Sequence, residues 1–221
     1  ATLVREDGHE DDVFTLIGPK KFDVPWKDLE RQGWIATARC VEIRVDLPHE
    51  EKMHYLSLTP KKQIRLAYEN PSKIAVAKEL IEKHKNDQVL IIGQYLTQIE
   101  QFAKEFGAPV ITGATPNKKR DELYNDFRTG KIKLLILSKV GNFAIDLPDA
   151  NVAIQISGSF GSRQEEAQRL GRILRPKKSD EPAVFYSIVT RESKELDFAM
   201  QRQLFLTEQG YSYEIEFREF S

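Results

Sequence analysis

From about residue 80 onward, short continuous apolar runs alternate with amphipathic segments. Continuous apolarity over a few residues predicts strands that are buried on both faces. The segments between them have helical spacing and end near glycine or proline, as helices do. Strands that alternate with helices predict a parallel α/β sheet, whose ligands bind at the carboxyl ends of the strands. The predicted strands are 89–92, 110–111, 134–137, 152–156 and 183–189, and the predicted helices are 95–106, 116–128, 164–174 and 192–208.

The first 80 residues have a different pattern. A strand is predicted over 13–17, a short helix over 25–32, and a β-rich stretch over 34–47. The charged segment 50–68 has a helical pattern that Pro60 interrupts. Because Lys61 and Lys62 follow that proline directly, we expect an exposed helical projection here rather than a core element.

Charge and cysteine content exclude several classes of protein. The 221 residues carry 33 Lys and Arg against 34 Asp and Glu, a net charge of −1, so a strongly basic nucleic-acid clamp is excluded but a local basic surface is not. The single cysteine, Cys40, excludes an intrachain disulfide and favours a reducing compartment. No apolar run approaches the ~20 residues of a membrane helix. The chain lacks an initial Met, and we expect it to be part of a longer protein.

The strongest candidate for chemistry is the phrase 168–175, QRLGRILR. Its arginines, Arg169, Arg172 and Arg175, recur at helical spacing, which by itself is also typical of a solvated basic face. Arginine at every position favours phosphate, because the guanidinium forks match phosphate oxygens. Such side chains can act as arginine fingers in phosphoryl transfer. No phosphate-binding loop, magnesium carboxylate pair or metal site is predicted.

Four phrases in order resemble motifs of superfamily 2 helicases. The 168–175 phrase resembles motif VI, 138–146 stands at motif V, and 89–94 stands at motif IV. Arg120 with 127–130, FRTG, resembles the Arg…Phe-x-x-Gly phrase before motif V. Within this superfamily the sequence most resembles the XPB family of DNA repair helicases, and the resemblance extends over the whole chain. The segments that show it are 1–7 (ATLVRED), 138–141, 145–148, 155–157, 166–172 and 209–212.

This resemblance implies a RecA-like α/β domain with a central parallel sheet flanked by helices. A thumb-like helical insertion is expected over about 48–70. The family's organisation further implies that 1–33 form the tail of a first helicase domain and a linker. Residues 34–221 would then form the second RecA-like domain.

The resemblance also assigns site residues. It implies catalytic roles for Arg172 and Arg175, and cofactor contacts for Asp146, Gln168 and Arg169. One departure is Ala144, where many relatives have glycine two residues before the motif V aspartate. The implied DNA contacts are Arg5, Glu6 and Asp7 of a RED motif, Lys61, Lys62 and Arg65 of the thumb, and Gln94, Gly113, Ser138 and Lys139.

The implied function is that of an ATP-driven DNA helicase or translocase, moving 3′ to 5′ in nucleotide excision repair and in transcription. ATP and Mg²⁺ would be held mainly by the first domain, so we expect no ATPase activity from these 221 residues alone. Expected partners are DNA, the first helicase domain, and either a repair nuclease in an archaeon or TFIIH subunits in a eukaryote. We expect an archaeal source, a cytoplasmic location (nuclear in a eukaryote) and a monomer.

Two alternatives come from other classes of protein. A non-catalytic DNA-binding or scaffold domain would not need Gly171 and three arginines at an inter-domain edge. ATPase activity that depends on Arg172 once the first domain is present would separate it from the helicase. A dinucleotide-dependent enzyme is disfavoured because no Gly-x-Gly-x-x-Gly follows any predicted strand.

Overall fold

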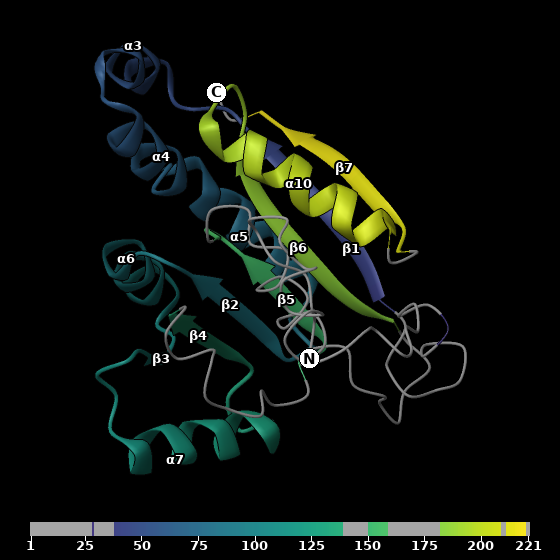
Figure 1. Ribbon diagram of the computed structural model, residues 1–221. Helices are drawn as coiled ribbons and strands as arrows, with labels where there is room; N and C mark the ends of the chain where they lie inside the picture. The colour runs from purple at the N-terminus through teal and green to yellow at the C-terminus, as the bar shows by residue number, and fades with distance from the viewer. Residues whose placement is uncertain (1–27, 29–37, 139–149, 159–181, 209–210, 220–221) are drawn as a thin grey trace, which may run out of the picture.

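The computed structural model describes residues 28, 38–138, 150–158, 182–208 and 211–219. Figure 1 shows a central sheet with helices on both faces. The strands are β1 (Ala38–Val45), β2 (Val89–Gly93), β3 (Val110–Ile111), β4 (Leu134–Ser138), β5 (Val152–Gln155), β6 (Ala183–Thr190) and β7 (Tyr213–Arg218). The helices are α3 (His49–Ser57), α4 (Pro60–Tyr68), α5 (Ser72–Lys83), α6 (Leu96–Phe106), α7 (Asn117–Arg128) and α10 (Lys194–Glu208).

The seven described strands form one sheet in the order β3-β4-β2-β5-β6-β1-β7. Every neighbouring pair is parallel, which confirms the predicted parallel α/β architecture. The apolar runs form the inner strands, and all five residues of β2 are buried. The carboxyl ends of all seven strands therefore lie at one edge of the sheet, which we call the carboxyl edge.

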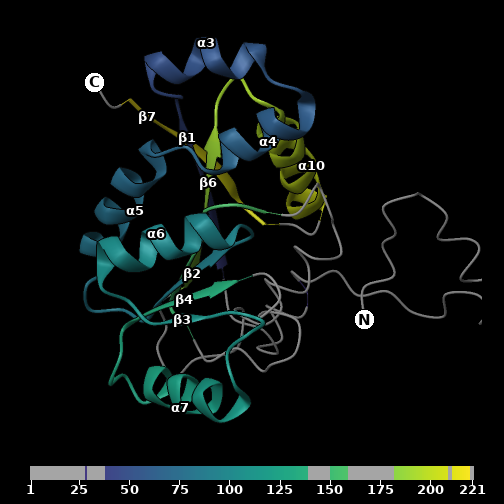
Figure 2. The same ribbon diagram turned by 90° about the vertical axis from the view of Figure 1, so that its left-hand side faces the viewer.

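Helices lie on both faces of the sheet (Figure 2), and each face has its own apolar layer. On one face, Val76 of α5 and Phe102 of α6 pack with alternate strand residues such as Ile43 and Ile91. On the other face, Phe127 of α7 and Leu206 of α10 pack with the intervening strand residues, such as Cys40 and Leu90. This double cover explains why β2, β4, β5 and β6 are apolar at almost every position rather than at alternate positions.

The helical insertion consists of α3 and α4 and lies beyond the carboxyl ends of β1 and β6 (Figure 1). Met53 and Leu56 on α3 are 73% and 72% exposed, as expected of a projection. The expectation that no part of it joins the core is wrong, because Ala67 and Tyr68 at the end of α4 are fully buried. The proline that separates the two helices is the first residue of α4, where its missing N–H costs nothing.

Two elements were not predicted. β7 is an edge strand whose residues alternate between Glu or Arg and aromatic or aliphatic side chains, so it lacks the apolar run of an inner strand. α5 was not predicted because charged residues interrupt its apolar positions, although Val76, Ala77 and Leu80 face the core.

α7 begins at Asn117, one residue after the predicted start of this helix, and Pro116 is its N-cap residue. The Thr115 hydroxyl accepts a hydrogen bond from the Thr112 N–H at 2.9 Å and closes the turn before the helix. The predicted strand 13–17 and the predicted helices 25–32 and 164–174 lie outside the described residues, apart from Asp28.

Candidate functional site

The carboxyl edge brings several predicted site residues to one end of the sheet. β2 ends at Gly93, directly before Gln94, and β4 ends at Ser138, directly before Lys139. Gly93 and Ser138 are register partners, so Gln94 and Lys139 follow adjacent strand ends. The described chain also reaches Gly158 just beyond β5, ten residues before the arginine-rich phrase 168–175.

Three predicted DNA contacts have different environments at this edge. Ser138 is 3% exposed, so its side chain is buried against the sheet. Gly113 is exposed in the turn that follows β3. Gln94 is half-buried, and its main-chain N–H donates to the Ser157 hydroxyl at 2.7 Å.

The three predicted thumb residues all lie on α4. Lys61 and Lys62 are exposed, and neither makes an ion pair within the part of the chain that the structure describes. Arg65 instead pairs with Glu69 at 2.9 Å, and its guanidinium lies 5.8 Å from the centre of the Tyr95 ring. The hydrogen bond to Glu69 raises the pKa of Arg65, which keeps its charge at all relevant pH values. The two lysines are therefore the available cations of this helix.

The remaining predicted residues lie outside the described residues, so their roles stay predictions. These are Arg5, Glu6, Asp7, Lys139, Asp146, Gln168, Arg169, Arg172 and Arg175.

The Arg…Phe-x-x-Gly phrase has a packing role in this structure. Arg120 donates to the carbonyls of Thr112 and Thr115, both at 3.2 Å, and so fastens the turn after β3 to α7. Phe127 is fully buried in the core. Gly130 has a φ of +76°, a backbone conformation that glycine adopts without strain.

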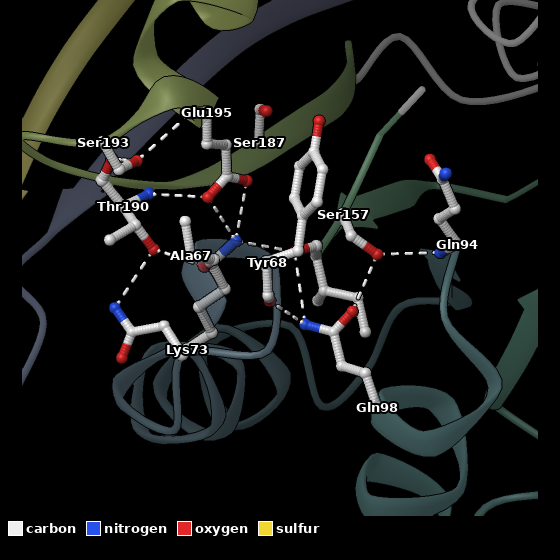
Figure 3. Close-up of polar contacts among 12 residues, drawn as sticks. Ala67, Tyr68, Lys73, Gln94, Gln98, Ser157, Ser187, Thr190, Ser193 and Glu195 are labelled. Atoms are coloured by element: carbon white, nitrogen blue, oxygen red, sulfur yellow. Dashed lines mark hydrogen bonds and ion pairs between the residues drawn. The ribbon is translucent and has the colours of Figure 1, made fainter. Parts of the chain in front are cut away.

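A buried ion pair lies between the insertion and the carboxyl edge (Figure 3). Lys73 Nζ of α5 donates to both carboxylate oxygens of Glu195 of α10, at 2.7 and 2.8 Å. It donates a third bond to the carbonyl oxygen of Ile156 at 2.9 Å, which uses all three ammonium donors. Lys73 is 0% and Glu195 1% exposed. Three good acceptors around one nitrogen are the arrangement that a charged ammonium requires.

Further buried polar residues extend from this pair. Glu195 accepts the Thr190 N–H at 3.0 Å, and the Thr190 hydroxyl donates to the carbonyl of Ala67 at 2.7 Å. Gln98 Nε2 donates to the carbonyl of Tyr68 at 2.5 Å. We call Lys73, Gln98, Ser157, Thr190 and Glu195 the buried polar network.

Burial opposes the charge of both members of the ion pair. It lowers the pKa of Lys73 and raises the pKa of Glu195, while each partner's charge acts in the opposite direction. Arg202 of α10 also contributes, because its charge lowers both pKa values. The attraction and the hydrogen bonds must therefore offset a desolvation penalty of several kcal/mol per ion.

The sequence analysis missed the buried polar network. Lys73 and Glu195 are 122 positions apart, and each is the second residue of its helix, a position at which a charged side chain is usually exposed. No signal in the sequence indicated this contact, because it depends on where α5 and α10 meet in the folded chain.

The parallel sheet with helices on both faces is the architecture of a RecA-like helicase domain. The C-terminal domain of the DEAD-box protein Dbp5 superposes with a TM-score of 0.58 at 16% identity, covering 83% of this chain and 91% of that domain. S. cerevisiae Dbp5 L327V bound to RNA and ADP BeF3 superposes with a TM-score of 0.62 at 15% identity, covering 99% of this chain and 50% of that one. These likenesses establish the fold.

The chain belongs to the ERCC3/RAD25/XPB C-terminal helicase family, and the sequence model of that family matches residues 29–219. It is 54% identical to the "DNA 3'-5' helicase XPB" of Mycobacterium tuberculosis, over 96% of this chain. It is 38% identical to the "General transcription and DNA repair factor IIH helicase/translocase subunit XPB/SSL2" of Saccharomyces cerevisiae, over 97% of this chain. The family resemblance is confirmed, whereas the expected archaeal source finds no support in these bacterial and eukaryotic relatives.

The chain spans 39% of the length of the mycobacterial relative and 26% of the yeast one. Among the described residues, no helix combines the length and apolarity that a bilayer crossing requires. The described ranges contain no cluster of three or more His, Cys, Asp or Glu side chains that could bind a metal ion.

Proposed function

We propose that this chain is the C-terminal helicase portion of an ATP-dependent DNA helicase or translocase that moves 3′ to 5′ in DNA repair and transcription. The 54% identity over 96% of the chain with a protein named as a DNA 3'-5' helicase carries this proposal. Residues 34–221 would form the second RecA-like domain, and 1–33 the end of the first domain and a linker.

In this proposal the chain supplies half of a nucleotide site. ATP with Mg²⁺ is held mainly by the first domain and supplies the phosphoanhydride bond that is hydrolysed. Arg172 and Arg175 stabilise charge on the transferring phosphoryl group, while Asp146, Gln168 and Arg169 contact the nucleotide. The carboxyl edge supports this assignment, because ligands of parallel sheets bind there.

The DNA surface would combine the insertion with the carboxyl edge. Lys61 and Lys62 contact phosphates, and Arg65, already paired with Glu69, positions α4 against Tyr95. Gln94, Gly113, Ser138 and Lys139 provide contacts along the strand ends. Arg5, Glu6 and Asp7 act at the point of strand separation. The protein partners depend on the organism: they are TFIIH subunits in a eukaryote and a repair nuclease in an archaeon.

The test is the ATPase rate of the full-length protein with and without DNA, for the native sequence and for Arg172→Ala. We expect DNA-stimulated hydrolysis that Arg172→Ala abolishes while DNA binding persists. The matched control is Arg39→Ala, which removes an exposed arginine at the amino end of β1 and should leave the rate unchanged. Full activity in Arg172→Ala would refute the arginine finger, and absence of ATPase in the native protein would favour the non-catalytic alternative.

A further inference from the structure

We infer that Lys73 and Gln98 are positioning residues that couple the helical insertion to the nucleotide half-site. This inference rests on the proposed function, in which the insertion binds DNA and the sequence after β5 carries the arginine fingers. The observation behind it is that two chains of buried hydrogen bonds leave the end of α4 and both reach residues 156–157 at the end of β5 (Figure 3).

The first chain runs through the ion pair. The carbonyl of Ala67 accepts from the Thr190 hydroxyl, and the Thr190 N–H donates to Glu195. Glu195 holds Lys73, whose ammonium donates to the carbonyl of Ile156 at 2.9 Å. α4, the end of β6, α10, α5 and the end of β5 are thereby joined by side chains that are almost fully buried.

The second chain runs through a single glutamine. Gln98 Nε2 of α6 donates to the carbonyl of Tyr68, and to that of Ile156 at 3.4 Å. Gln98 Oε1 accepts from the Ser157 hydroxyl at 2.7 Å, and that same hydroxyl accepts the Gln94 N–H. Gln98 thus contacts the insertion on one side and the exit of β5 on the other, and through Ser157 it is linked to the exit of β2.

Directional bonds transmit a displacement that apolar contacts would absorb. A hydrogen bond weakens steeply when its angle departs from linear, so α4 cannot shift without moving the Ile156 carbonyl or breaking a buried bond. A broken bond would leave a buried polar group unsatisfied, which is strongly unfavourable. DNA binding at the insertion is therefore linked to the position of the chain that leaves β5.

The primary test uses Gln98→Met in the full-length protein. Methionine keeps the length and volume of the side chain but removes both amide atoms, and the ion pair remains. We measure the ATPase rate with and without DNA, the KM for ATP, the Kd for DNA and the melting temperature. Coupling between sites is typically 5–150-fold, so we expect the ratio of DNA-stimulated to basal rate to fall about tenfold. The basal rate, the KM and the Kd should each stay within about twofold, since the direct contacts are intact.

The second test replaces both ions, because removal of one alone endangers folding. Lys73→Met with Glu195→Met removes both ions of the pair together, so neither is left buried without the other, and the variant should fold. We expect the same loss of DNA stimulation as in Gln98→Met. The matched control is Glu42→Gln, which alters a buried carboxylate of β1 that is bonded to Arg44 and Tyr213 and belongs to neither hydrogen-bond chain. It should change the melting temperature but not the stimulation ratio.

A double-mutant cycle separates coupling from general loosening. Gln98→Met is measured in the native background and in Lys61→Ala with Lys62→Ala, at saturating DNA. If the network transmits from the insertion, the two changes are non-additive, because each removes the same step. Additive effects, or a native stimulation ratio in both Gln98→Met and the double-methionine variant, would overturn the inference. If the native protein shows no DNA-stimulated ATPase, the proposed function fails as well, and that result is distinct from stimulation that the variants retain.

Discussion

Replacing Lys73 with methionine should strongly destabilise the fold. The change deletes both Lys73–Glu195 bonds and one of the two side-chain donors to the Ile156 carbonyl, leaving Gln98 at 3.4 Å. Breaking a buried pair by removing one ion costs about 3–5 kcal/mol. Of the groups that donate to the Glu195 carboxylate, only the Thr190 N–H then remains. The charge of Arg202 also still acts on Glu195. At ~2–4 °C per kcal/mol for a domain of this size, the melting temperature should fall by about 6–20 °C.

This loss of stability should depend on pH with a defined sign. Burial already raises the pKa of Glu195, and removal of the Lys73 charge raises it further. The folded variant then binds a proton more tightly than the unfolded chain, so its stability falls as pH rises. The deficit relative to the native sequence should be smallest below the unfolded carboxyl pKa of about 4.3. It should reach its full size above the raised pKa of the folded state.

Urea unfolding of the 221-residue chain, followed by circular dichroism at pH 4.5 and pH 8, measures both quantities. Lys73→Met with Glu195→Met is the control, since it has no lone buried ion. Its unfolding free energy should lie within about 1 kcal/mol of the native value or above it, because apolar replacement of a buried pair is often neutral or stabilising. A Lys73→Met deficit below about 1 kcal/mol, or a deficit that is equal at the two pH values, would refute this account of the ion pair.

Three further predictions concern the proposed activity and the packing of the carboxyl edge. In the full-length protein, Arg172→Ala should lower kcat of the DNA-stimulated ATPase by roughly 10³–10⁵-fold. Arg172→Lys should recover little of this kcat, because the lysine ammonium cannot make the bidentate phosphate contact of a guanidinium. Steady-state kinetics measures both variants. Lys61→Ala with Lys62→Ala should weaken DNA binding and lower the slope of log K against log salt by up to about 1.8, from ~0.9 per phosphate contact, as measured by anisotropy titrations. The double-lysine control is Lys131→Ala with Lys133→Ala at the amino end of β4, and an equal effect of the two pairs would contradict the thumb assignment. Gly93→Ala should destabilise the fold by about 1–3 kcal/mol in urea unfolding, because a Cβ there would lie 2.9 Å from Ile99 Cγ1 and 3.2 Å from Ile156; native stability would show that these side chains can move aside.

The sequence predicts the sheet well because burial on both faces leaves a strong pattern. β2, β4, β5 and β6 are apolar at almost every position, and the predicted limits match them within one or two residues. β7 left no such pattern, since an edge strand needs only one apolar face and here carries Glu214, Glu216 and Arg218 on the other. Its place beside β1 is set by register partners such as Phe217 with Arg44. No local pattern indicates such a pairing, which joins residues far apart in the chain.

The residues of the candidate site likewise differ in how far the sequence indicates their environment. The exposure of Lys61 and Lys62 on a helix could be predicted, because a charged run after a helix-breaking proline indicates an exposed helix without any tertiary information. Lys73 and Gln98 could not, because a lysine or glutamine at helical spacing is typical of a solvated face. Their burial depends on α4, α10 and the end of β5 meeting at one place, which only the assembled sheet determines.

We infer that the ion pair at this junction contributes conformational specificity rather than stability. The inner strands are otherwise packed with apolar side chains, and methionine or leucine at both positions would fill the space without a desolvation penalty. An apolar pair would, however, allow α4 and the end of β5 to slide past each other, since dispersion contacts have little directional preference. Lys73 admits one arrangement, in which its three donors meet two carboxylate oxygens and the Ile156 carbonyl. In the proposed function, DNA contact at the insertion sets the position of the segment that follows β5, and that coupling requires this kind of fixed geometry at the root of the insertion.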